Sequence, residues 1–317
     1  MAARARLRES FNYLKRAQLM KQSIVPDSRR EHPILGSRPA LPRKITVIRP
    51  PGFSFGMIVA GLITLLGYQD LLYTLTIFRI SIRYKQSILG WIWAVLQPLA
   101  LMTIYTLIFF RVARVPSEGA PYPLFVFSGL LPWIFFSSAV SNSINGLINY
   151  PALLTRMYFP REIIPLSYVL AALVDFVIAC VILSGLMAYY RVPPNWNDLY
   201  LLPIVTILGA FTSAVALFLS SIQVRFRDVG VALPLLLQVG MFAAPVVYST
   251  TSVPLKFRQL FLLNPVASLI DSFRRVLLHG LTPDFAMLST AGLVTLCCLA
   301  VSYGYFKATE GNMADML

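Results

Sequence analysis

Residues 87–110 read SILGWIWAVLQPLALMTIYTLIFF, a stretch of 24 residues without a charged side chain. About 20 apolar residues in a helix are enough to cross the hydrocarbon core of a bilayer. The whole chain has the same character, with 57% hydrophobic and only 13% charged residues, whereas soluble domains carry about 25% charged residues. An apolar excess of this size cannot be hidden in one soluble core, so the sequence predicts an integral membrane protein.

Further apolar stretches of spanning length follow, separated by charged or turn-rich breaks. With the first stretch, the predicted spans are 87–110, 122–140, 165–190, 199–223, 231–248 and 285–306. They predict an all-α membrane protein with six transmembrane helices, whose even number places both termini on one side. Of the 27 Lys and Arg residues, 15 lie within residues 1–86. The positive-inside rule therefore predicts that both termini are cytoplasmic.

The chain before the first span divides into two segments. Residues 1–56 combine scattered basic side chains with several prolines, which is typical of a mostly disordered cytoplasmic tail. Residues 57–86 predict an interfacial segment, because the apolar run 57–66 is too short to cross a bilayer. Residues 68–86 fit both an amphipathic helix and an alternating strand. We favour the helix, since an isolated strand at the membrane edge leaves its backbone groups unpaired.

The predicted interfacial helix has an apolar stripe and a basic flank. The stripe repeats at helical spacing and consists of Leu71, Leu75, Phe78 and Ile82. On the flank, Arg79, Arg83 and Lys85 are expected to lie on lipid phosphates. From the residues alone, the helix is a snorkelling anchor to the membrane surface.

The segment 249–283, between the fifth and sixth spans, is too long and too apolar for an ordinary loop. Its informative residues are Asn264, Pro265, Asp271, Arg274 and Arg275. The Asn-Pro pair predicts a corner between two short helices, and the aspartate stands at helical spacing from both arginines, so an ion pair is expected.

The sequence lacks the motifs of nucleotide, metal and acyl chemistry, namely GxxxxGK[ST], HExxH and GxSxG. Its three cysteines have neither metal-ligand nor redox spacing. We therefore expect no catalytic, cofactor-binding or metal-binding residue in this chain. The formal charge of +14 is concentrated before the first span, which indicates a flank on the membrane and not nucleic acid binding.

Asp175 is the one acidic residue inside a predicted span, and such residues are functional candidates. A proton-coupled carrier would need further intramembrane groups for a relay, so we expect Asp175 to pack inward onto a polar partner. Two alternative functions stay open at this point. An ion-coupled carrier would be expected to show internal repeats, and a membrane enzyme acting on lipid-linked sugars would need an acidic pair such as DxD.

Four blocks of sequence, in order, carry a resemblance to a known family. Residues 79–98 read RISIRYKQSILGWIWAVLQP, 127–136 read FSGLLPWIFF, 158–166 read YFPREIIPL, and RFRD at 225–228 is followed by APVVY at 244–248. The first block closely resembles the RYKQSxLGWxWxxLQP signature of ABC-2 type permeases that export lipid-linked polysaccharides such as O-antigen, capsule and teichoic acid. The resemblance covers residues 70–317.

The resemblance implies a permease subunit in the bacterial inner membrane that moves a lipid-linked glycan outward. It implies a homodimer that works with two copies of an ATP-binding cassette ATPase, which would hold the ATP and Mg²⁺. The segment 249–283 would then contain gate helices that re-enter the outer leaflet.

The resemblance also implies roles for particular residues. A lipid pyrophosphate head group would first meet the protein at Arg79, Arg83, Tyr84, Lys85, Gln86, Trp91 and Trp93. The ATPase would dock on Tyr158, Phe159, Pro160, Arg161 and Glu162, where exposed aromatic side chains flanked by charges suit a partner interface; a loop that merely caps two spans is the alternative. Aromatic side chains that could stack on sugar rings in a pore are Tyr105, Phe109, Trp133 and Phe136, although most such residues face lipid.

Overall fold

The computed structural model describes residues 61, 64–85, 90, 92–112, 114, 116–150, 159–250, 254 and 263–316. All of them belong to one unit, Pro50–Leu317. The described residues are helical and contain no strand, so the predicted all-α class is confirmed. The helices are α3 (Gln69–Lys85), α4 (Ile92–Tyr105), the π-helix η1 (Thr106–Val112), α5 (Tyr122–Ile144), α7 (Ile163–Tyr189), the 3₁₀ helix η2 (Trp196–Tyr200), α8 (Leu201–Arg225), α9 (Asp228–Ala243), α11 (Pro265–His279) and α12 (Phe285–Met316).

Five helical segments within the described residues are long and apolar enough to cross a membrane. They are Ile92–Val112, Tyr122–Ile144, Ile163–Tyr189, Trp196–Arg225 and Phe285–Gly311. Each overlaps one of the predicted spans. At the remaining predicted span, 231–248, the structure has the shorter apolar helix α9, which ends at Ala243. The six-span count therefore stays a prediction.

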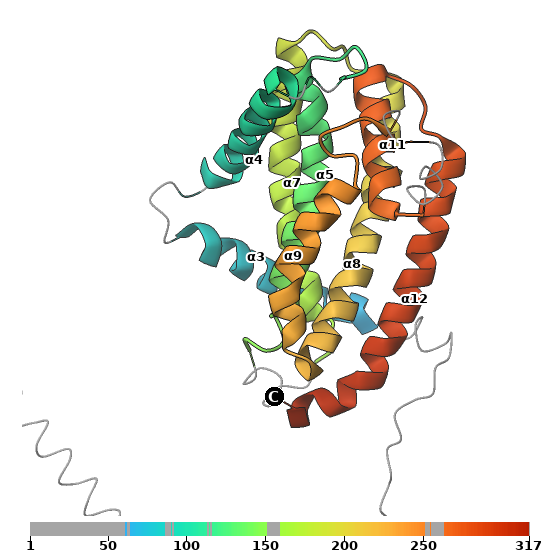
Figure 1. Ribbon diagram of the computed structural model, residues 1–317. Helices are drawn as coiled ribbons and strands as arrows, with labels where there is room; N and C mark the ends of the chain where they lie inside the picture. Colours follow the sequence, from blue (N-terminus) through green and yellow to red (C-terminus); the bar gives the residue numbers. More distant parts are fainter. Residues whose placement is uncertain are drawn as a thin grey trace, which may run out of the picture. The chain divides into compact units, whose positions relative to one another are not determined.

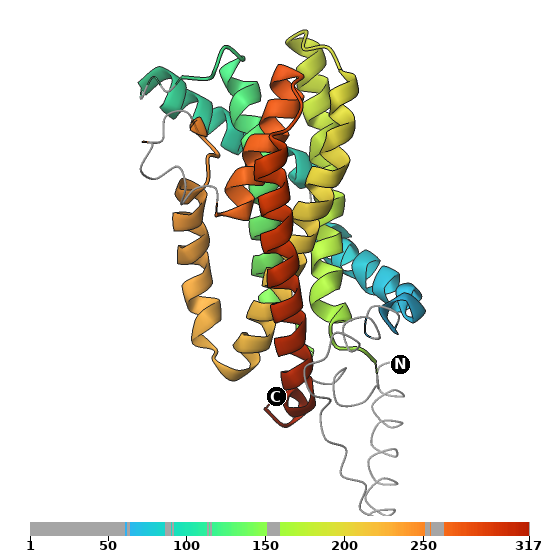
Figure 2. The same ribbon diagram turned by 90° about the vertical axis from the view of Figure 1, so that its right-hand side faces the viewer.

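Helix α5 is the centre of the bundle. It is the most buried of the five candidate spans, and α4 with η1 is the most exposed. Figure 1 shows α7 beside α5, and α5 also contacts α8 and α11. Figure 2 shows α12 running alongside α8 for most of its length. Since α5 is covered on several sides, its side chains form the core against which the surrounding helices pack.

The segment 68–86, which is predicted to be interfacial, is helical over Gln69–Lys85, so the prediction of a helix instead of a strand is confirmed. The predicted apolar stripe is divided, since its first two leucines are half-buried against the bundle and its last two residues face outward. Phe78 and Ile82 of the predicted apolar stripe are exposed, whereas Arg79 is buried. This arrangement suits a lipid environment, in which apolar side chains face outward and polar ones find partners inside the protein.

Helix α11 is delimited by its capping residues. The Asn264 side chain accepts a hydrogen bond from the Val266 backbone N–H (3.1 Å), and Pro265 occupies the first helical position. The helix ends at Gly280, which has a φ of 61° in the left-handed region. The predicted corner at Asn264 and Pro265 is thus the start of α11, which is one continuous helix over Pro265–His279.

Candidate functional site

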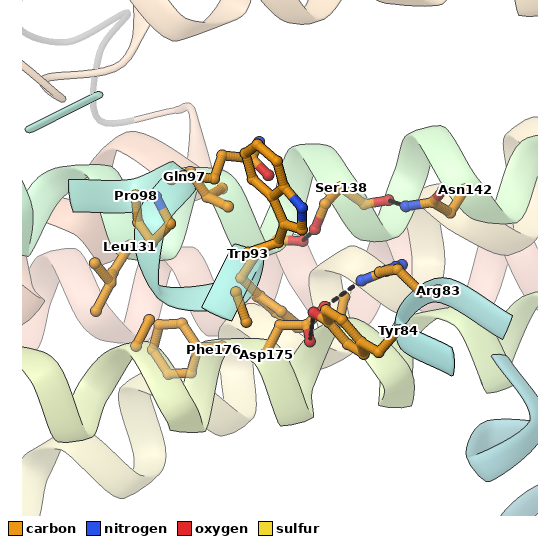
Figure 3. Close-up of a pocket in the computed structure, with 15 residues that line it drawn as sticks. Arg83, Tyr84, Trp93, Gln97, Pro98, Leu131, Ser138, Asn142, Asp175 and Phe176 are labelled. Atoms are coloured by element: carbon orange, nitrogen blue, oxygen red, sulfur yellow. Dashed lines mark hydrogen bonds and ion pairs between the residues drawn. The ribbon is translucent and has the colours of Figure 1, made fainter. Parts of the chain in front are cut away.

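A cavity of about 370 Å³ lies between α3, α4, α5 and α7. Figure 3 shows Arg83 and Tyr84 of α3 on one side of it and Trp93, Gln97 and Pro98 of α4 on another. Its polar lining consists of Arg83, Tyr84, Gln97, Ser138, Asn142 and Asp175. Polar side chains are rare inside a membrane domain and mark substrate pathways or functional contacts. The cavity is therefore the first candidate site.

Asp175 stands near the middle of α7 and connects that helix to α3. The Tyr84 hydroxyl donates a hydrogen bond to Asp175 Oδ1 (2.7 Å), and Arg83 Nη1 forms an ion pair with Asp175 Oδ2. The prediction that Asp175 packs inward onto a polar partner is confirmed. Burial of Tyr84, together with its hydrogen bond to Asp175, raises the pKa of Tyr84 to about 12. The tyrosine therefore stays a neutral donor at physiological pH.

Arg79 is buried one turn before this contact. Its guanidinium lies between the rings of Tyr150 (4.3 Å to the centroid) and Tyr168 (4.2 Å), and Nε has no hydrogen-bond partner. None of the ion pairs in the described part of the chain involves it. The expectation that Arg79 lies on lipid phosphates is wrong, because two aromatic faces take up the guanidinium inside the protein.

A second, open groove of about 440 Å³ lies between α4, α5 and α9. Its aromatic lining is Tyr105 and Trp133, together with Phe242 near the end of α9. Its uncharged polar lining consists of Gln97, Ser137, Ser138, Ser141 and Gln238. The groove shares Gln97, Ile134 and Ser138 with the cavity beside α3, so the two hollows adjoin.

The start of α7 is tied to α12 by a buried charged cluster. The Glu162 side chain is fully buried and accepts hydrogen bonds from the Tyr303 hydroxyl (3.1 Å) and from Lys307 Nζ (2.9 Å). Lys307 also pairs with Glu310 (2.9 Å). The Glu310 side chain accepts from the Arg161 backbone N–H (3.2 Å), and the Arg161 side chain donates to the Glu310 backbone carbonyl.

A buried arginine holds α11 against its neighbours. Arg274 Nη2 donates to the Val246 carbonyl (2.8 Å), Nη1 donates to the Tyr248 carbonyl (3.3 Å), and the guanidinium lies 3.8 Å from the centroid of the Phe125 ring. Burial lowers the pKa of Arg274 to about 10, so the side chain is still cationic at neutral pH. Asp271 accepts from the Thr250 hydroxyl (2.8 Å) instead.

Five helical segments long and apolar enough to cross a membrane are typical of a membrane domain. Comparison with known proteins identifies its family. The sequence model described as "ABC-2 type transporter" matches residues 70–278. The chain belongs to the ABC-2 type transporter family. It is a membrane subunit of a transporter and not an enzyme, and the ATPase is on a separate subunit. Within the described residues, no group of three or more His, Cys, Asp or Glu side chains could hold a metal ion.

Relatives of this ABC-2 chain match it over most of their length. It is 32% identical to the O-antigen export system permease protein RfbA of Myxococcus xanthus, over 79% of this chain and 96% of that protein. It is 29% identical to RfbA of Klebsiella pneumoniae, over 80% of this chain and 97% of the relative. It is 23% identical to the polysialic acid transport protein KpsM of Escherichia coli, over 74% and 92% respectively.

The predicted docking segment of this ABC-2 subunit differs from the expected exposed surface. Tyr158 lies outside the described residues. Phe159, Pro160 and Glu162 are buried, and Arg161 is half-buried. The expectation of exposed aromatic side chains is therefore wrong for Phe159, because hydrophobic and charged side chains of the same chain cover this segment. The docking role itself stays a prediction.

The predicted pairing within α11 is also wrong. No ion pair joins Asp271 to Arg274 or Arg275, although all three are described. Arg274 uses backbone carbonyls, and the exposed Arg275 donates from Nε to the Thr282 carbonyl (3.1 Å). Helical spacing could not predict the partners of Arg274, because the carbonyls of the corner Ala244–Tyr248 lie outside α11 in the sequence.

The structure separates the remaining predicted residues. Trp93 lines the cavity beside α3, and Lys85 is exposed at the end of α3, whereas Gln86 and Trp91 lie outside the described residues. Of the predicted pore aromatics, Tyr105 and Trp133 line the groove. Phe109 and Phe136 are absent from both hollows, and Phe136 stacks on Phe211 (5.9 Å).

Several site residues were not expected from the sequence. They are Gln97, Ser137, Ser138, Ser141, Asn142 and Gln238, which line the two hollows. A signal existed, because four of them repeat on one face of the mainly apolar helix α5. Lys307, Tyr303 and Glu310 were missed as well, and no local pattern links them to Glu162.

Proposed function

We propose that this chain is the permease subunit of an ATP-driven exporter that moves a lipid-linked polysaccharide from the cytoplasmic side across the inner membrane. The observation that carries the proposal is the nearly full-length match to relatives named as O-antigen export permeases. The polysialic acid transport protein among the relatives has a related cargo class. A glycan on a lipid carrier therefore fits this site better than an ion or a small solute.

The groove between α4, α5 and α9 is proposed as one wall of the glycan path. Amide and hydroxyl groups such as those of Gln97, Ser141 and Gln238 can exchange hydrogen bonds with sugar hydroxyls. The flat faces of Tyr105 and Trp133 suit the apolar faces of sugar rings. A groove with this many polar groups is poorly suited to lipid, and such groups usually face an aqueous path or another protein.

A second copy of the chain would close this path. The side chains along α9 are largely exposed, including Val231, Leu235 and Val239, and those of α4 and η1 are similarly uncovered. In the proposed homodimer, these faces of two copies surround the glycan. Two copies of the separate ATPase, which bind ATP and Mg²⁺, would press on residues 158–162 and switch the pair between closed and open arrangements.

The proposed membrane arrangement completes this assignment. Helix α9 with the corner Ala244–Tyr248 forms the fifth of six spans, α3 lies in the cytoplasmic interface, and α11 re-enters the outer leaflet. Both termini are then cytoplasmic. Of the proposed access residues for the lipid-linked head group, the exposed Lys85 and the partly exposed Arg83 can contact a phosphate, whereas the buried Arg79 supports the helix from within.

Reconstituted transport tests the proposal. The permease is purified with its ATPase and placed in proteoliposomes, and a lipid-linked O-polysaccharide is added to the outer face of the vesicles. For transporters inserted with their ATPase outward, this outer face corresponds to the cytoplasmic side. Glycan should become protected inside the vesicles only when hydrolysable ATP and Mg²⁺ are added. Protection that ignores ATP, or a purified permease that associates with no ATPase, would contradict the proposal.

The groove has its own test. Replacing Gln238 by Leu keeps the volume but removes the amide, and we expect ATP-dependent export to fall about tenfold, since losing hydrogen bonds along a path is worth about 1.4 kcal/mol. The matched control is Val181→Ala on the exposed face of α7, outside both hollows. Equal export by Gln238→Leu and the wild type would remove this groove from the path.

A further inference from the structure

We propose that Lys307 and Tyr303 of α12 are positioning residues that fix the docking segment to the last spanning helix through the buried Glu162 carboxylate. A movement imposed at residues 159–162 would then be delivered to α12 instead of being absorbed in a flexible loop. This inference rests on the proposed function, because it assumes that the ATPase acts at this segment. It concerns contacts within one chain and gives α12 the role of receiving the movement that the ATPase imposes on residues 159–162.

The geometry makes Glu162 an unusual residue for a loop that connects two spans. Its side chain is fully buried, and both carboxylate oxygens are engaged by α12, with Lys307 Nζ at 2.8 Å from Oε1 and 2.9 Å from Oε2. The Tyr303 hydroxyl adds a third contact one helical turn away. A buried carboxylate needs this compensation, because removing an isolated charge from water is strongly unfavourable.

A second set of contacts reinforces the same junction. Lys307 bridges Glu162 and Glu310, and Glu310 in turn binds the backbone N–H of Arg161. Two consecutive residues of the docking segment, Arg161 and Glu162, are therefore held by one face of α12. A loop that merely caps two spans does not need ion pairs to α12, whereas a segment that transmits movement to α12 needs a rigid connection to it.

From this junction α12 leads to the other end of the bundle. Figure 2 shows α12 extending from the C-terminal end, beside α8, toward the region of α11. The helix packs against both α8 and α11. A continuous helix that carries the joint at one end and contacts α11 at the other offers a direct physical link between the docking segment and the proposed gate.

The decisive variant removes the joint without leaving a buried charge. The double substitution Glu162→Gln/Lys307→Met keeps the volume of both side chains and is tolerated better than a single charge removal. In the reconstituted complex with its ATPase, we expect normal ATPase association and continued ATP hydrolysis, with glycan exported per ATP hydrolysed about tenfold lower. The single variant Lys307→Arg keeps the cation beside Glu162, so the amount of glycan that it exports per ATP hydrolysed should stay close to that of the wild type.

Two further variants keep the test independent of folding. Tyr303→Phe removes a single hydrogen bond to Glu162, and we expect the ratio to fall about threefold. Arg225→Met, which removes an exposed cation at the end of α8 that forms no ion pair within the described residues, is the matched control and should leave the ratio unchanged.

The outcomes separate this inference from the proposed function. If the wild-type complex shows no ATP-dependent export, the proposed function fails. If the wild type exports and the double variant loses export only in proportion to its amount in the membrane, the cluster is structural and the positioning role is wrong. Unchanged export per ATP in both the double variant and Tyr303→Phe would overturn the inference in the same way.

Discussion

A half-buried and a buried cation at opposite ends of the bundle are stabilised in different ways. Lys307, near the C-terminal end, is paired with the carboxylates of Glu162 and Glu310. Arg274, on α11 at the other end (Figure 1), has no carboxylate of the described residues within ion-pair distance and relies on two backbone carbonyls and the ring of Phe125. Both arrangements compensate a cation that is largely removed from water, but they depend on different kinds of partner.

The difference determines how each contact responds to mutation. An ion pair consists of two side chains, so a second substitution can compensate for the first. The partners of Arg274 are main-chain carbonyls of the corner after α9, which no substitution can remove. The arginine also depends on Gly129, because a Cβ there would lie 2.6 Å from the Val246 carbonyl oxygen and would overlap the Arg274 guanidinium. Arg274 is therefore a fixed clamp, whereas the Lys307 cluster is an exchangeable joint.

The largest expected effect comes from Arg274→Leu. The substitution leaves the Val246 and Tyr248 carbonyls without their donors and removes the contact with Phe125, so we expect the free energy of unfolding to fall by about 4 kcal/mol. Thermal denaturation of the detergent-purified protein measures the loss. The matched control is Arg275→Leu at the exposed neighbouring position, for which we expect a loss below about 1 kcal/mol. Equal losses for the two variants would contradict a clamp at Arg274.

The sequence was sufficient for five of the six predicted spans and for the helical state of α3. Length and hydropathy decide whether a segment can cross a bilayer, and both are local properties. The fifth predicted span, 231–248, shows where this reasoning ends. Residues 244–248 are apolar, so hydropathy continues through them, yet α9 ends at Ala243 and Pro245 follows, which cannot donate a helical hydrogen bond.

The partners of the polar residues could not be predicted in the same way. Asp175 was recognisable because an acid inside a span needs a partner, but Tyr84 lies 91 positions earlier in the sequence. Glu162 was expected at an exposed interface, since a charged residue in a loop between spans usually meets water. Its burial depends on Lys307, which is 145 positions away. Arg79 was placed on lipid because nothing local indicates the rings of Tyr150 and Tyr168.

An intermediate effect is expected at the exchangeable joint. Lys307→Met leaves a buried Glu162 carboxylate without its cation, and we expect a loss of about 3 kcal/mol. Combining it with Glu162→Gln should recover about 2 kcal/mol of this loss, since the double variant contains no unpaired buried charge. A double-mutant cycle of thermal denaturation measures the recovery. Strictly additive losses would mean that the two side chains act independently, and the contrast with Arg274 would disappear.

The smallest effect is expected at Asp175, where the ion pair with Arg83 is partly exposed. Asp175→Asn keeps an oxygen that can accept from Tyr84 and loses only the charge, so we expect a loss of about 1 kcal/mol. Because this contact joins α3 to α7, the loss should be local, and backbone amides of α3 should exchange with deuterium about fivefold faster while those of α5 are unchanged. Lys85→Gln, at an exposed position of α3, is the control and should leave this exchange unaltered. Faster exchange throughout the bundle would instead place Asp175 with Arg274, as part of the fixed framework, and would leave α3 without a separable contact of its own.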